Sequence, residues 1–188
     1  MRLFLALNLP KKERERIERA ARPLREQKLP VRWVGLEDFH VTMKFLGEVR
    51  PQRMESIQGV LDKVGATTVP FEATVTGFGA FPTIRNPTVL WAGVDATPEL
   101  RCLKQDLEWA LSELGFEKET RAFHPHLTLG RAQEGGGAGA FRGLDDLTAS
   151  LQVESRFAVR TVDLMRSQAT RTGHRYTVLH RARLTGEA

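Results

Sequence analysis

The chain has 188 residues, of which 41% are hydrophobic and 27% are charged, with a formal net charge of +5. These totals are typical of a soluble globular protein, here expected to form one domain over residues 1–188 in the cytoplasm, and the basic balance favours anionic partners. The single cysteine excludes an intrachain disulfide, and no apolar segment approaches the length of a membrane span, so no association with a membrane is expected.

The chain opens with a predicted strand and a charged helix. Residues 2–7 are a short apolar run closed by Asn8 and Pro10, which is typical of a buried strand. Pro10 suits the start of a helix that continues through residues 11–27. We expect Pro23 to end or kink this helix, because proline cannot donate the helical hydrogen bond.

The middle of the chain alternates predicted strands and helices. Thr97 and Pro98 are typical of a helix start, and leucines then recur at helical spacing until Gly115 ends the pattern. The other elements predicted here are strands at 31–34, 40–46, 70–81 and 87–94 and a helix at 51–66.

The last third of the chain begins with another apolar strand, within residues 123–131. A glycine-rich stretch at 134–140 predicts a flexible connection. A short helix near 144–150 and two long strands, 153–166 and 174–183, complete the pattern. This order, with several short turns between strands, indicates an α+β fold of mixed or antiparallel sheets with helices packed on their outer faces.

Two of the predicted strands carry the same polar pair. "FHVTMKFLG" (39–47) and "FHPHLTLGR" (123–131) each place a histidine and a threonine two residues apart in an apolar run. Successive side chains of a strand point to opposite faces. His40, Thr42 and Lys44 are therefore predicted to share one face, and Val41, Met43 and Phe45 to face the core. In the second strand His126 and Thr128 share the polar face.

Two histidines that meet in one cleft suit acid–base chemistry. Histidine titrates near neutrality, so one imidazole can accept a proton while the other donates one. Opening a 2′,3′-cyclic phosphate of RNA needs both steps. The threonine hydroxyls, with Lys44 or Arg131, are candidates for holding the non-bridging phosphate oxygens. No metal and no cofactor are required by this scheme.

Two alternatives remain open on these residues. His124 and His126 form a His-x-His pair that is able to ligate a metal from one face of a strand. A binding module that holds RNA ends without catalysis would also explain a basic cleft. His174 and His180 have no motif partner and are interpreted as surface or sheet residues, and Tyr176 as structural or catalytic.

The sequence resembles the 2H phosphoesterases, specifically the RNA 2′,3′-cyclic phosphodiesterases that are also named 2′-5′ RNA ligases. The resemblance spans nearly the whole chain, through "RLFLALNLP", "RWVGLEDFHVTMKFLGEV", "PTVLWAGV", "FHPHLTLGR" and "VDLMRSQATRTGHRYTVL". It implies a bilobal α+β fold in which two antiparallel sheets form a V-shaped central cleft, with one motif on each lobe.

The resemblance also implies roles for the motif residues. His40 is the expected proton donor and His126 the expected proton acceptor, and Thr42 and Thr128 bind phosphate. Arg131 matches the family's phosphate-binding arginine, but strict alternation would turn it away from His126, so this role requires a strand end or a bulge. The expected substrates are RNA or nucleotides with 2′,3′-cyclic phosphate ends, which are opened to 2′-phosphomonoesters without a metal, and the same acid–base pair would reversibly join and cleave 2′-5′ linkages. We expect a monomer without an obligatory protein partner.

Overall fold

The computed structural model describes residues 1–134, 139–171 and 173–187. Residues 135–138 of the predicted glycine-rich connection lie outside the described residues. Within the described ranges, no helix is long and apolar enough to cross a membrane.

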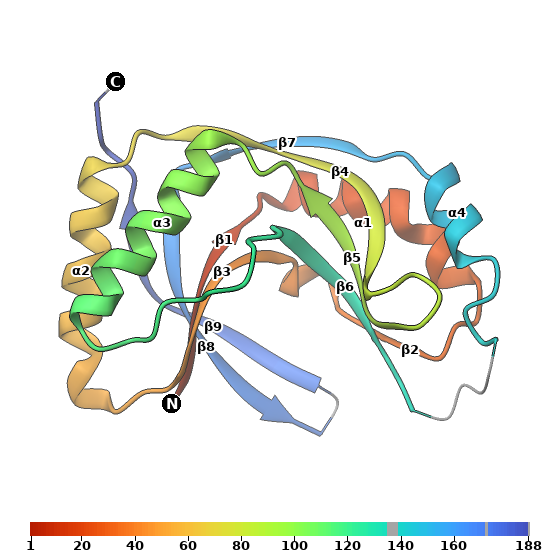
Figure 1. The fold of residues 1–188 in the computed structure, drawn as a ribbon, viewed down its shortest axis with the longest axis horizontal. Helices are drawn as coiled ribbons and strands as arrows, with labels where there is room; N and C mark the ends of the chain where they lie inside the picture. Colours follow the sequence, from red (N-terminus) through yellow and green to blue (C-terminus); the bar gives the residue numbers. More distant parts are fainter. Residues whose placement is uncertain (135–138, 172, 188) are drawn as a thin grey trace.

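The described chain forms an α+β fold with four α-helices and nine antiparallel strands (Figure 1). The helices are α1 (Lys11–Glu26), α2 (Met54–Thr67), α3 (Pro98–Glu113) and α4 (Leu144–Ser150). The strands are β1 (Arg2–Asn8), β2 (Val31–Trp33), β3 (His40–Glu48), β4 (Phe71–Pro82), β5 (Pro87–Val94), β6 (His126–Ala132), β7 (Glu154–Val159), β8 (Thr161–Thr170) and β9 (Gly173–Arg183). Short 3-10 turns cover Leu36–Asp38 and Pro51–Arg53.

The strands form one sheet in the order β7-β4-β5-β6-β3-β1-β8-β9, with β2 paired to β6. The expectation of two separate sheets is not met, because β3 and β6 are paired. Their register comprises a single pair, Val41 opposite Leu127, whereas the other strand pairs are longer. The two strands that carry the His-Thr pairs are therefore neighbours at the narrowest junction of the sheet.

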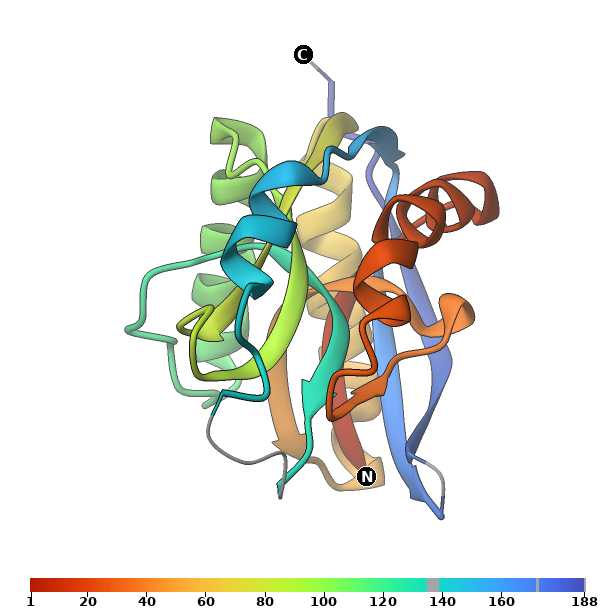
Figure 2. The ribbon, with the colours of Figure 1, turned by 90° about the vertical axis from the view of Figure 1, so that its right-hand side faces the viewer.

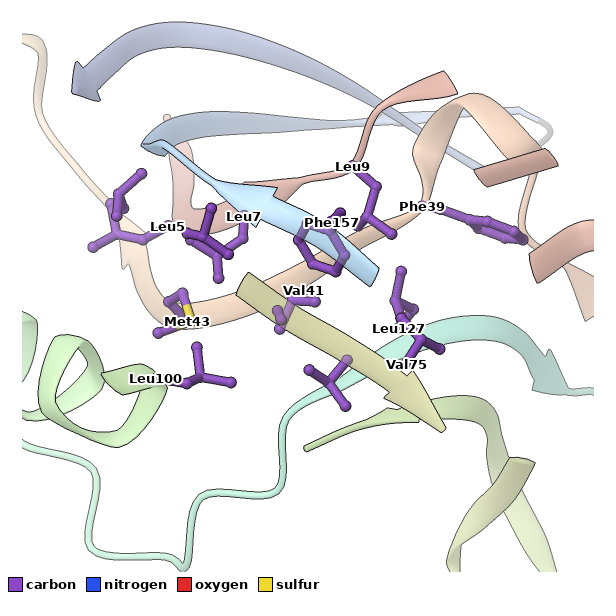
Figure 3. Packing of buried hydrophobic residues seen from close by; sticks show 14 of the residues in the cluster. Leu5, Leu7, Leu9, Phe39, Val41, Met43, Val75, Leu100, Leu127 and Phe157 are labelled. Carbon is purple, nitrogen blue, oxygen red and sulfur yellow. The ribbon is translucent and has the colours of Figure 1, made fainter. Parts of the chain in front are cut away.

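One face of the sheet is apolar and is covered by the helices. Leu5 and Leu7 of β1, Val41 of β3 and Leu127 of β6 point into a common core with Phe157 (Figure 3). Helices α2 and α3 lie side by side at one end of the molecule, and α1 and α4 lie at the other (Figures 1 and 2). The polar members of β3 and β6 alternate with these core residues and are left on the opposite face.

The structure corrects one predicted element boundary and decides part of another prediction. Helix α1 continues past Pro23 to Glu26, so the proline lies inside the helix and does not end it, and the alternative of a kink at Pro23 stays a prediction. Residues 153–166 are not one strand, because the chain breaks at Arg160 into β7, which pairs with β4, and β8, which pairs with β1. The residues of the main core change from odd numbers, Phe157 and Val159, to even numbers, Val162 and Leu164, across this break, and this change of phase marks the boundary in the sequence.

Candidate active site

The two histidines occupy equivalent places at the starts of β3 and β6. His40 Nδ1 lies 2.7 Å from the Asp38 carbonyl, and His126 Nδ1 lies 2.8 Å from the His124 carbonyl. A carbonyl oxygen only accepts hydrogen bonds, so each Nδ1 carries the proton in the neutral ring. This leaves Nε2 of each imidazole as the nitrogen available to a ligand, in the same tautomer on both strands.

Each motif strand is interrupted by an irregularity after the threonine. In the β1–β3 register, Leu5 opposes Lys44 and Ala6 opposes Thr42, so Met43 is an extra residue. In the β5–β6 register, Leu90 opposes Gly130 and Trp91 opposes Thr128, so Leu129 is an extra residue. Each strand consequently buries two successive residues and then resumes alternation with the opposite phase.

The change of phase turns one further side chain of each strand toward the histidines. Arg131 lines the same cavity as His126. The bulge at Leu129 precedes Arg131 and reverses the alternation, which is the condition that the predicted role of Arg131 required. Phe45 also lines this cavity and is 67% exposed, so its predicted place in the core is wrong. Phe45 and Arg131 thus occupy corresponding positions, five residues after His40 and His126.

Lys44 does not face the cavity, contrary to the alternation that predicted it there. The bulge turns this side chain to the helix-covered face, where it is 4% exposed and its Nζ lies 2.5 Å from Glu108 of α3. Lys104, one turn before Glu108, donates to the other Glu108 oxygen (2.6 Å), to Glu119 (2.8 Å) and to the Met43 carbonyl (2.6 Å). A buried ion network therefore holds the bulge of β3, and Lys44 is unavailable to a phosphate.

A cavity of about 500 Å³ brings the two motifs together. Its lining includes His40 and Thr42 of β3 and His126 and Thr128 of β6. The β3–β6 junction divides the sheet into two halves, β7-β4-β5-β6 and β3-β1-β8-β9, so one motif comes from each half. The residues that line the cavity are Arg2, Leu3, Phe4, Val34, Asp38, His40, Thr42, Phe45, Gly47, Val89, His126, Thr128, Arg131, Ser167, His174 and Tyr176.

Aromatic rings enclose both imidazoles. His40 forms a cluster with Phe4 and Tyr176, each with a ring centroid 5.1 Å from the imidazole, and His126 lies 5.0 Å from Phe81. Burial lowers the pKa of His40 from 6.5 to about 4, against the opposing effect of the hydrogen bond to the Asp38 carbonyl. Burial also lowers the pKa of His126, and the charge of Arg131 acts in the same direction. Both rings are therefore neutral at pH 7 in the ligand-free protein.

The depressed pKa of His40 predicts how stability depends on pH. The folded-state pKa of about 4 lies below the unfolded value of 6.5, so the unfolded chain binds more protons between these values. The stabilising contribution is complete above pH 6.5 and is lost as the pH falls toward 4. We expect the wild type to lose on the order of 1–3 kcal/mol more unfolding free energy over this window than His40→Gln. Urea unfolding at pH 4.5 to 7 measures the difference, with the exposed His174→Gln as control, and equal slopes for His40→Gln and the wild type would contradict it.

The β8–β9 hairpin contributes His174, which was interpreted from the sequence as a surface or sheet residue, and Tyr176, whose role the sequence left open between structural and catalytic. Tyr176 and His174 line the cavity and stack on each other, with ring centroids 6.2 Å apart. Burial raises the pKa of the Tyr176 phenol, although Arg131 opposes the rise, so the group is a neutral hydrogen-bond donor at pH 7. His180 lies elsewhere and pairs with Asp62 at 2.7 Å, in agreement with its interpretation as a sheet residue.

The structure also gives the contacts of His124, the first member of the His-x-His pair. It is the backbone carbonyl of His124 that contacts His126, and the His124 ring lies 6.3 Å from Phe81. Within the residues that the structure describes, no three His, Cys, Asp or Glu side chains are grouped as metal ligands.

Comparison with known proteins places these features in a family. The family model described as "LigT like Phosphoesterase" matches residues 7–91 and 94–176. The chain is 33% identical to the RNA 2′,3′-cyclic phosphodiesterase of Methanothermobacter thermautotrophicus over 98% of this chain and 99% of that protein. It is 32% identical to the RNA 2′,3′-cyclic phosphodiesterase of Geobacillus stearothermophilus over 90% of this chain, but it spans only 53% of that relative.

The fold is also similar to a solved structure with a nucleotide. E. coli LigT, in its complex with 3′-AMP, superposes with a TM-score of 0.75 at 27% identity, over 98% of both chains.

Proposed function

Since the chain belongs to the LigT like phosphoesterase family, we propose that it is an RNA 2′,3′-cyclic phosphodiesterase, which opens 2′,3′-cyclic phosphate ends to 2′-phosphomonoesters. The observation that carries this proposal is the pair of equivalent histidines in one cavity, each with Nδ1 held by a backbone carbonyl and a threonine two residues later. Family membership and the full-length similarity to the RNA 2′,3′-cyclic phosphodiesterase of Methanothermobacter thermautotrophicus support the substrate class.

In the proposed reaction His126 is the base and His40 is the acid. His126 Nε2 takes a proton from water as the water oxygen bonds to phosphorus, the P–O3′ bond breaks, and His40 gives a proton to O3′. An anionic phosphate in the cavity favours the charged form of an imidazole, so substrate binding raises the pKa of His40 and allows it to carry the proton. With the 5′-hydroxyl of a second RNA strand in place of water, the same proton transfers would form a 2′-5′ linkage, and the reverse of that step would cleave it.

Three further side chains hold the phosphate in this proposal. The hydroxyls of Thr42 and Thr128 and the guanidinium of Arg131 line the cavity beside the histidines. As hydrogen-bond donors they stabilise the negative charge that gathers on the non-bridging oxygens. Phe45, exposed at the same cavity, offers a ring for stacking a nucleobase.

We also propose that the two halves of the sheet act as two lobes of one unit, with a V-shaped cleft between the motif strands. The narrow β3–β6 junction and a cavity lined from both halves support this arrangement. The unit over residues 1–188 is proposed to act as a monomer in the cytoplasm, on RNA or nucleotides and without an obligatory protein partner.

Turnover of adenosine 2′,3′-cyclic phosphate in excess EDTA tests this function. The expected result is hydrolysis at the rate seen without chelator, with a bell-shaped pH profile from two coupled groups. Loss of activity with EDTA would favour the metal site at His124 and His126. Binding without hydrolysis would favour the RNA-binding module.

A further inference from the structure

A second cavity adjoins the catalytic one and shares Arg131 with it. Its volume is about 200 Å³, and it shares part of its lining with the catalytic cavity. The shared residues are Val34, Asp38, Arg131, His174 and Tyr176. Arg32 of β2 lines the second cavity and not the first, as do Thr170 at the end of β8 and Gly173 at the start of β9.

The β2–β6 pairing sets Arg32 directly opposite Arg131. Residues that oppose each other in an antiparallel pair project from the same face, so both guanidinium groups are directed to the cavity side. The close approach of β2 depends on Gly130, because a Cβ there would overlap the Val31 side chain. The glycine of the second motif therefore brings Arg32 to this position.

Two like charges in this arrangement are unfavourable unless an anion lies between them. Neighbouring arginines are neutralised: Arg14 pairs with Glu37 at 2.9 Å, and Arg25 pairs with Glu18 at 2.8 Å. Within the described ranges, neither Arg32 nor Arg131 forms an ion pair, although the Asp38 carboxyl also lines the cavity. The second cavity is thus prepared for an anionic group adjacent to the scissile phosphate.

We propose that Arg32, with Arg131, binds a second phosphate, the one attached to O5′ of the nucleotide that carries the cyclic phosphate. This proposal rests on the proposed function. In an RNA end this group is the internucleotide phosphodiester, and in a mononucleotide it is a 5′-phosphomonoester. Both present non-bridging oxygens to paired guanidinium donors. Arg32 is then the residue that makes the enzyme distinguish phosphorylated ends from a bare cyclic nucleoside.

Kinetics with three substrates test the role of Arg32. They are adenosine 2′,3′-cyclic phosphate, its 5′-phosphorylated form, and the dinucleotide ApA with a 2′,3′-cyclic end. We expect Arg32→Gln to lower kcat/KM for the second and third by about 10- to 100-fold and to change the first by less than about 3-fold. Arg32→Lys should restore part of the loss. Arg22→Gln, an exposed arginine of α1, makes the same change of net charge and should keep the wild-type preference.

The comparison of the two phosphorylated substrates identifies the source of the phosphate. If Arg32→Gln lowers kcat/KM for both phosphorylated substrates, the site recognises the 5′-phosphate that they share. If kcat/KM falls only for the 5′-phosphorylated nucleotide, the site binds the monoester, and if it falls only for the dinucleotide, the site binds the diester. An equal loss with all three substrates would overturn the proposal, as would a change of preference in Arg2→Gln instead of Arg32→Gln.

A binding measurement keeps this inference separate from catalysis. Calorimetry compares adenosine 2′-monophosphate with adenosine 2′,5′-bisphosphate, neither of which contains a cyclic phosphate. The 5′-phosphate should tighten binding to the wild type about 10-fold or more and should add little in Arg32→Gln. If the wild type binds both ligands equally, the second phosphate site is refuted. If the preference is present but no substrate is hydrolysed, it is the proposed function that fails.

Discussion

Replacing either His40 or His126 by alanine is expected to lower kcat/KM on a 2′,3′-cyclic nucleotide by a factor on the order of 10²–10⁴. Each imidazole is fixed by its backbone carbonyl in the same cavity, so neither is positioned to take over the proton transfer of the other. Unfolding curves establish that the variants are folded. Near-wild-type turnover in either folded variant would contradict the two-histidine assignment.

A substrate with sulfur in place of O3′ separates the two roles in these variants. A departing thiolate needs little help from an acid, because the pKa of a thiol is about 8.5. His40→Ala should therefore recover most of its loss on this substrate, and His126→Ala should not. The reverse pattern would exchange the acid and the base, and similar losses on both substrates would leave neither histidine as the acid.

Replacing Lys104 by methionine is expected to destabilise the fold by about 3–5 kcal/mol. The change removes the donor to the Met43 carbonyl at the bulge and leaves Glu119 without its buried partner. It also removes one of the two lysines that neutralise Glu108, whose pKa they hold below its usual value in spite of burial.

Urea unfolding measures this change, with Lys63→Met on the exposed surface of α2 as the matched control, which should stay within about 0.5 kcal/mol of the wild type. A loss below about 1 kcal/mol for Lys104→Met would show that the network does not hold the bulge.

The period-two pattern of the motif strands predicted part of the site correctly. Val41 and Leu127 lie in the core, and His40 and His126 lie on the opposite face, because alternation follows from strand geometry alone. A bulge breaks that rule. The bulge of β3 is set by its pairing with β1, and the bulge of β6 by its pairing with β5, so the face on which Phe45 lies depends on contacts between residues distant in sequence.

Some residues of the site could not be placed from the sequence, because they come from elements other than the two motif strands. Tyr176 reaches His40 only through the order of β1, β8 and β9 in the sheet, which local patterns do not specify. The buried ion network around Glu108 could have been predicted in part from the sequence. Lys104 and Glu108 lie one turn apart on the leucine-rich face of α3, where charged side chains are not expected without partners. The position of Arg32 was harder to predict from the sequence, because its place opposite Arg131 depends on the pairing of β2 with β6.

The identity of the product tests the central claim most directly. Adenosine 2′,3′-cyclic phosphate should be converted by the wild type, in EDTA and ¹⁸O-labelled water, to adenosine 2′-monophosphate with one labelled phosphate oxygen. Phosphorus NMR and mass spectrometry identify both features. Adenosine 3′-monophosphate as the product, or an unchanged substrate, would contradict the account.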